Sequence, residues 1–221
     1  MDKARLFHDL STRDTSLLLA VLSVVYDEMT YDQRDAVFGP YAEALPPAPV
    51  DGETLLDEIK LFHSESLAGV YYGPFAINSR NYRHIPEETK EWFGRLGNLL
   101  TASRQLTMRG VHEHAVACFE ILFELIDALD QGDEIVFGDE IGSWMIPVDE
   151  QVYMAAYLTS LAATTTPEEF TATVLPLLRR DSWQNFVAQA YPAVIGVATQ
   201  EQRTQLDAEI QRQGIRTERD L

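Results

Sequence analysis

Basic residues are scarce in this chain and are missing from its middle. The 221 residues include 17 Lys and Arg against 35 Asp and Glu, which gives a formal net charge of −18. No Lys or Arg occurs between Arg109 and Arg179, whereas residues 110–178 contain 13 acids. Nucleic-acid phosphates and anionic lipid surfaces attract clustered cations. The charge balance therefore argues against direct binding to nucleic-acid phosphates and against binding to a membrane.

Cysteines and long hydrophobic runs are also scarce. Cys118 is the only cysteine, so no disulfide can form within the chain, and a lone thiol suits a reducing cytoplasm. The longest dense apolar run, residues 17–26, is interrupted by Ser23 and is far shorter than the ~20 residues that cross a bilayer. The first ten residues lack the basic and apolar regions of a signal peptide. We therefore expect a soluble, cytoplasmic protein.

The motifs of common enzymes and metal sites are missing as well. The chain has no G-x-S-x-G, phosphate-binding loop, G-x-G-x-x-G or H-E-x-x-H. His114 and Cys118 lie four residues apart on a predicted helix, but a structural zinc site needs four ligands. The acids near residue 130 do not match the ligand pattern of an EF-hand calcium loop. In a loop that starts at Asp127, ligand position 3 is Leu129, and in one that starts at Asp130 it is Gly132. We therefore predict no cofactor and no metal site, and we favour a non-catalytic protein.

Apolar residues at helical spacing fill most of the remaining chain. Residues 17–25 are apolar on nearly all sides, which predicts a helix buried on most of its surface. The helix after Thr30 is expected to stop near Gly39-Pro40, because proline disfavours a helical residue before it. Typical helix-start residues precede most predicted helices; they are Asp14, Thr30, Asp51, Asp149, Thr166, Ser182 and Thr199.

The predicted helix over residues 111–130 has the clearest structural role. Its charges fall at positions 113, 120, 124 and 127, which form one narrow stripe, and apolar residues cover the remaining surface. A helix with one thin polar stripe is typical of the centre of a helical array. We therefore expect this helix to be the central packing element.

These elements predict a mainly α fold of about nine helices in antiparallel pairs, arranged as a helical-repeat-like superhelix or an irregular bundle. A small β-hairpin near 134–146 is a further option. The proline-rich stretch 45–49 is the one plausible linker, and because it is short we expect residues 1–221 to form a single helical domain with a mobile tail over 214–221. The helix pairs resemble HEAT, armadillo and tetratricopeptide arrays in architecture only, since their consensus motifs are absent.

Two non-helical segments contain the candidate binding residues. Residues 70–85 are aromatic and basic, whereas residues 131–148 are aromatic and acidic. Each segment follows one helix and precedes another, so an array of paired helices places both on one side, where they touch. They form either a plug of the core or a recognition surface, since aromatic and Arg side chains commonly anchor interfaces. The candidate binding residues are Tyr72, Arg80, Arg83, His84, Asp133, Glu134, Asp139, Glu140 and Trp144.

Four functional hypotheses follow. The leading one is a non-catalytic interaction module that presents the acidic surface of residues 113–150 to a basic protein, with salt-sensitive binding. The second is self-association, in which residues 78–109, with a local charge of +3, meet the acidic segment of another copy. The third is a carboxylate- or metal-dependent hydrolase with its site among the 70–85 and 131–148 loops. The fourth is an acidic inhibitor that mimics nucleic acid.

Overall fold

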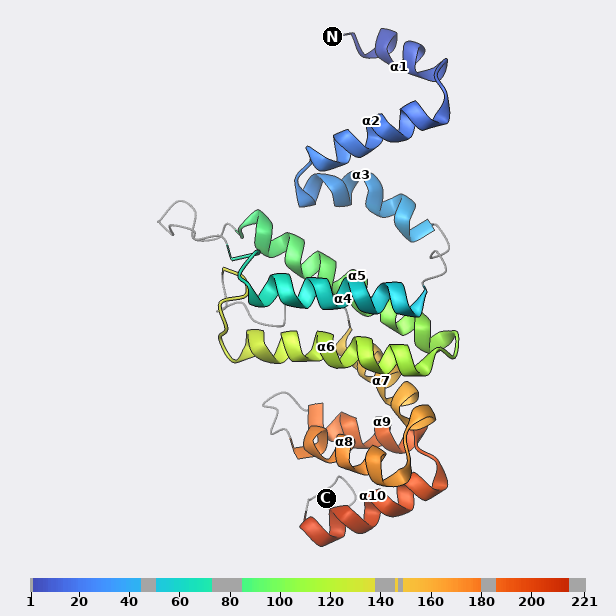
Figure 1. The fold of residues 1–221 in the computed structure, drawn as a ribbon, viewed down its shortest axis with the longest axis vertical. Helices are drawn as coiled ribbons and strands as arrows, with labels where there is room; N and C mark the ends of the chain where they lie inside the picture. Colours follow the sequence, from blue (N-terminus) through green and yellow to red (C-terminus); the bar gives the residue numbers. More distant parts are fainter. Residues whose placement is uncertain are drawn as a thin grey trace. The chain divides into compact units, whose positions relative to one another are not determined.

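The structure is a computed structural model of the chain. It describes residues 2–44, 51–72, 85–137, 146, 149–179 and 186–214. These residues form ten α-helices and no strand, which confirms the predicted mainly α fold (Figure 1). The chain divides into two compact units, Met1–Ala48 and Pro49–Leu221. Because the boundary falls in the proline-rich stretch, the single domain stays a prediction, and residues 215–221 of the predicted tail lie outside the described residues.

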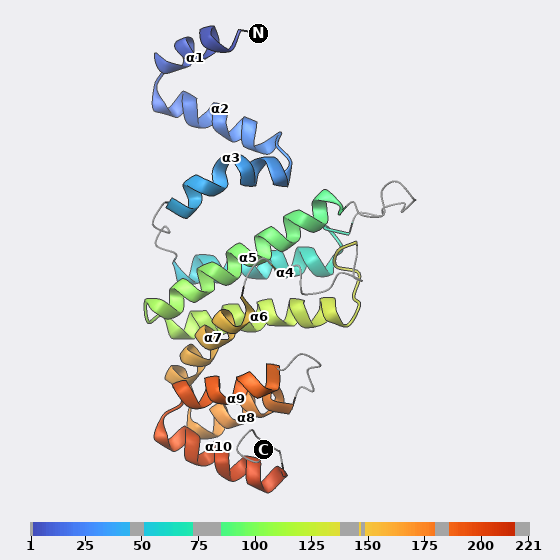
Figure 2. The ribbon, with the colours of Figure 1, turned by 180° about the vertical axis from the view of Figure 1, so that it is seen from behind.

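The N-terminal unit contains α1 (Lys3–Ser11), α2 (Thr15–Asp27) and α3 (Tyr31–Ala44), which follow one another in a zigzag (Figures 1 and 2). Arg34 of α3 ties the α2–α3 corner, since its Nε donates to the Tyr26 carbonyl over 2.9 Å. No residue of α1 or α2 is buried. The expected burial of α2 is therefore not found in the described structure.

The end of helix α3 differs from the sequence-based prediction. The sequence predicts an end near Gly39-Pro40, but the helix continues to Ala44. Proline clashes with the Cβ and N–H of the residue before it when that residue is helical. Gly39 has no Cβ, which removes part of this clash, so the helix passes through the proline. The predicted start is correct, because Thr30 and Gln33 exchange the two hydrogen bonds of a capping box.

Four helices form the first half of the C-terminal unit: α4 (Gly52–Leu67), α5 (Glu87–Met108), α6 (His112–Asp130) and α7 (Glu150–Thr164). Helix α5 runs antiparallel to both α4 and α6, so α4 and α6 lie side by side in the same direction (Figure 1). The N-terminal ends of α4 and α6 meet where Gly52 lies against His114. Their C-terminal ends therefore also lie at one end of the unit.

The second half contains α8 (Pro167–Arg179), α9 (Phe186–Val197) and α10 (Gln200–Gln213). Pro176 lies within α8 without ending it. Buried Gln202, in the capping box of α10, donates to the Ala162 and Thr165 carbonyls at the end of α7. This side chain satisfies acceptors that a helix end leaves unpaired, so it joins the two halves.

Helix α6 occupies the centre of the first half, as its sequence predicts. It packs against α4, α5 and α7, and its buried face includes Cys118, Phe119 and Leu122, each 0% exposed. Its carboxylates Glu113, Glu120 and Glu124 are exposed. None of the described helices combines the length and apolar content that crossing a bilayer requires.

The optional β-hairpin near 134–146 is not supported. Residues 134–137 form turns and bends, and of 138–146 the structure describes only residue 146. The Ile135 N–H donates to the Asp133 carbonyl over 2.7 Å, which closes a three-residue turn. Ile135 and Val136 of this segment are both buried. The apolar run therefore anchors a turn in the core and does not form a strand.

Candidate functional site

The candidate site lies where α4 and α6 end. In α4, the N–H groups of Gly69 and Val70 donate to the Ser66 and Glu65 carbonyls. The same pair of bonds closes α6, from Gly132 and Asp133 to Leu129 and Ala128. This Schellman pattern requires a left-handed residue, and the two glycines have φ values of +74° and +89°. Each helix therefore turns sharply at the same end of the unit.

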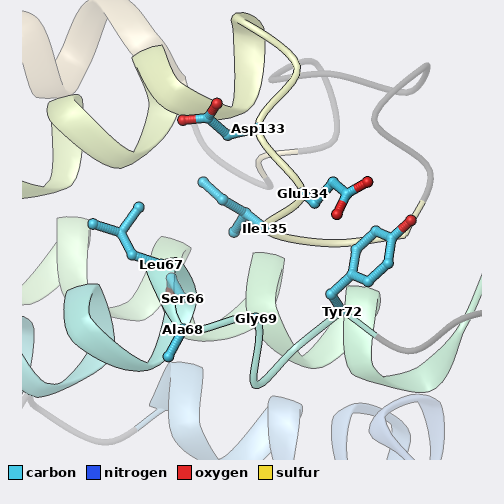
Figure 3. A pocket seen from close by; sticks show the side chains of 8 residues that line it. All are labelled: Ser66, Leu67, Ala68, Gly69, Tyr72, Asp133, Glu134 and Ile135. Atoms are coloured by element: carbon cyan, nitrogen blue, oxygen red, sulfur yellow. The ribbon is translucent and has the colours of Figure 1, made fainter.

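A cleft of about 450 Å³ opens between these two ends. One wall is the end of α4 and the turn that follows it; the other begins directly after Gly132 (Figure 3). Asp133 and Glu134 are exposed, and Tyr72 is half-buried. The Glu134 carboxylate lies toward the Tyr72 ring, whereas the Asp133 carboxylate points away from it (Figure 3). The lining residues are Ser66, Leu67, Ala68, Gly69, Tyr72, Asp133, Glu134 and Ile135.

A polar network behind the α4 wall attaches it to α5. Arg95 of α5 donates to the Glu65 carboxylate over 2.9 Å and also to the Tyr71 hydroxyl. Its guanidinium lies 4.9 Å from the centre of the Phe62 ring. Burial raises the pKa of Tyr71, although the charge of Arg95 opposes this shift. The network neutralises Glu65 and holds the turn that ends at Tyr72.

Helix α5 also holds the opposite wall. The Thr89 hydroxyl donates to the Phe137 carbonyl over 2.9 Å, and the rings of Tyr72 and Phe137 lie 6.1 Å apart. Ile135 and Val136 anchor the same segment in the core. The described parts of the two non-helical segments thus touch beside α5, and the cleft remains open next to this contact.

The described groups that border the cleft carry negative charge and no positive charge. A helix C-terminus carries roughly half a negative charge, and both α4 and α6 end here. Asp133 and Glu134 add two carboxylates, and no described residue forms an ion pair or hydrogen bond with either side chain. None of the described lining residues is basic. The arrangement is thus complementary to a cationic group.

Three of the candidate residues come together in this cleft, namely Tyr72, Asp133 and Glu134. Their role in binding stays a prediction. Arg80, Arg83, His84, Asp139, Glu140 and Trp144 lie outside the described residues. Sequence reasoning missed the 66–69 wall, although Gly69 directly after an apolar helix is a recognisable C-terminal signal.

The structure also brings together a polar cluster that the sequence did not suggest. The Ser160 hydroxyl lies 2.8 Å from the Thr107 hydroxyl and 3.1 Å from Nδ1 of His112. A Ser–His contact is the geometry of an activated nucleophile. However, Ser160 is 0% exposed, so a substrate has no access to its hydroxyl. The cluster satisfies buried polar groups between α5, α6 and α7.

The remaining metal and nucleophile candidates also lie away from the cleft. Cys118 is buried in α6, and burial raises the pKa of its thiol to about 11. Such a thiol is inert, because the thiolate is the reactive form. His114 packs against Gly52 at the opposite end of α6. Within the described ranges no group of three or more His, Cys, Asp or Glu residues is arranged to hold a metal ion.

Comparisons with known proteins identified no relative of this chain. The chain matches no family model, no curated protein and no solved structure.

Proposed function

We propose that this protein is a non-catalytic, acidic, helical interaction module that binds a basic partner protein. The cleft between the ends of α4 and α6 is its binding site and accepts a Lys or Arg side chain of the partner. One observation carries the proposal: two exposed acidic residues and two helix C-termini border a cleft whose described lining includes no cation. A cationic group complements this charge, whereas an anionic one is repelled.

The lining also suits the shape of a long basic side chain. Lys and Arg have apolar stems, which pack along apolar surface while the charged end remains at a polar site. Leu67 and Ile135 provide the apolar walls, and Tyr72 offers an aromatic face to a cation. Glu134, whose carboxylate lies toward Tyr72, then accepts a hydrogen bond from the ammonium or guanidinium, and Asp133 adds negative charge at the edge of the cleft. Polar and apolar contacts together distinguish this cleft from a merely acidic surface.

The test uses the full chain and a fluorescent peptide of six Lys-Gly repeats, with binding followed by anisotropy. Affinity is expected to fall as NaCl rises from 20 to 200 mM, because salt screens exposed charges. The double substitution Asp133→Asn and Glu134→Gln should weaken binding about 10-fold, equivalent to about 1.4 kcal/mol. A Glu-Gly peptide of equal length is the negative control.

A matched variant separates the cleft from overall charge. The substitutions Glu58→Gln and Glu168→Gln also remove two exposed acids, but both lie outside the cleft lining. They should change the dissociation constant by less than about 2-fold, since distant exposed charges are largely screened. Equal weakening by the two double variants would show that peptide binding depends on the net charge of the protein alone, and the proposed site would be wrong.

A cytoplasmic location is part of this proposal. It is supported by the single cysteine, which suits a reducing compartment. Labelling of the tagged protein in intact cells, followed by fractionation, tests this part independently of the cleft.

A further inference from the structure

Helix α2 has an apolar surface that its own unit leaves uncovered. Between Asp14 and Asp27 it has no charged residue, yet none of its residues is buried. Leu19 and Val24 are each 62% exposed. Apolar surface of this kind on a folded protein commonly marks an interaction site.

One stripe of α2 is arranged for pairing with a copy of itself. Leu17, Ala20, Val21 and Val24 recur at intervals of three and four residues, so they share one face of the helix. Tyr26 lies half a turn away from Leu17 and contacts Phe38 of α3 with ring centres 5.5 Å apart. The stripe therefore faces away from that contact.

The ends of the stripe have opposite charges. Arg13 directly precedes the N-cap Asp14, and Glu28 is the C-cap; both side chains are exposed. If a second copy of α2 packs antiparallel, Arg13 lies opposite Glu28 of the second copy. In the same register Leu17 faces Val24, and Ala20 faces Val21. Each residue of the stripe thus meets a complementary one, as a two-fold interface requires.

The stripe is part of a wider apolar surface. Ten large apolar side chains of the N-terminal unit are at least 38% exposed, and Leu17, Val21 and Val24 of the stripe are among them. An interface through the stripe alone is smaller than the roughly 800 Å² per partner of a standard stable interface, so the dimer is expected to be weak. We propose that two copies of this protein form a dimer by antiparallel pairing of their α2 helices.

Light scattering on the full chain during size-exclusion chromatography tests this proposal. The wild type is expected to show twice the chain mass of 25.0 kDa at 100 µM and to dissociate on dilution. Val24→Glu places a carboxylate within the apolar stripe and should give a monomer at 100 µM. Leu61→Glu is the control, since Leu61 is 54% exposed on α4 in the other unit, and it should leave the dimer intact.

A charge exchange tests the antiparallel register. Arg13→Glu should weaken the dimer at least 5-fold, because two acids then face each other. Adding Glu28→Arg in the same chain restores opposite charges and should return the dissociation constant to within about 2-fold of the wild type. Both substitutions favour the dipole of α2, so loss of the helix does not explain a weaker dimer.

Three results would overturn the proposal. One is a wild-type monomer at 100 µM, which would mean that no second copy covers the apolar face of α2. Another is a dimer that persists in Val24→Glu, since the interface would then lie elsewhere. The third is a dimer that Arg13→Glu weakens and Glu28→Arg fails to restore.

Discussion

Individual positions in the C-terminal unit are constrained by close packing, and Gly52 is the clearest case. A Cβ at Gly52 would lie 2.8 Å from Cγ of His114, a separation that forces the histidine ring or α4 to move. Overpacking of this kind costs about 1–3 kcal/mol. Gly52→Ala should therefore lower the free energy of unfolding, measured by urea denaturation, by that amount.

Gly196 provides the matched control for this prediction. It lies in α9 with no atom within 4 Å of its Cβ position, so Gly196→Ala should be neutral or stabilise by up to about 1 kcal/mol through helix propensity. Equal stability changes for the two variants would contradict the packing argument.

At the same scale, Cys118 should behave as an inert thiol. It is 0% exposed, and its pKa is raised to about 11 by burial, so only about one thiol in a thousand is ionised at pH 8. A disulfide reagent at pH 8 should leave the native protein unlabelled over the time in which the guanidinium-unfolded protein reacts completely. Met108→Cys, at a position that is 74% exposed, should label at once; immediate labelling of the wild type would disprove the burial of Cys118.

At the scale of the element, two helix starts depend on ionised side chains. The Asp51 carboxylate accepts from the backbone N–H and hydroxyl of Thr54, and these bonds lower its pKa from 3.8. The Glu169 carboxylate likewise accepts from Thr166, which lowers its pKa from 4.5. A lowered pKa means that the folded state favours the ionised form, so the stability gained is present above the ordinary pKa and is lost as pH falls through the folded value.

The variant Asp51→Asn with Glu169→Gln tests this dependence. Both replacements retain an acceptor oxygen but do not titrate. The wild type should be the more stable protein at pH 6, and its urea midpoint should fall more steeply than that of the variant between pH 4.5 and pH 2.5. Glu58→Gln, an exposed acid within α4, is the control; parallel curves for wild type and double variant would refute the assignment.

At the scale of the whole molecule, the two units should unfold separately. Unit Met1–Ala48 has no buried residue in α1 or α2, whereas unit Pro49–Leu221 contains the buried core. All three tryptophans, at positions 92, 144 and 183, belong to the second unit. Circular dichroism at 222 nm should therefore show an early thermal transition that tryptophan fluorescence does not detect.

Protein concentration provides the second arm of this experiment. If α2 pairs between copies, a higher concentration should raise the temperature of the early transition and leave the fluorescence transition unchanged. Coincident transitions for both probes would mean that the chain unfolds as one cooperative domain, as the sequence alone predicted.

Local signals account for most of what was predicted correctly. Asp14, Asp51, Asp149 and Thr199 cap their helices as expected, because a cap needs only neighbouring backbone groups. The end of α3 was predicted wrongly, because Gly39 eases the restriction that Pro40 imposes. The hairpin was not supported, because residues 134–137 form turns and bends; β propensity depends strongly on tertiary context, and here Ile135 and Val136 anchor a turn in the core.

The sequence by itself determined the helical composition, the place of α6 at the centre and the absence of basic residues from 110–178. These follow from periodicity and composition, which are local. Only the tertiary structure decided that α4 and α6 end side by side, which brings Tyr72 to Asp133 and Glu134. Only the tertiary structure showed that the N-terminal unit buries no residue of α2. The physical reason is that direction and neighbourhood are set by packing between residues far apart in the chain.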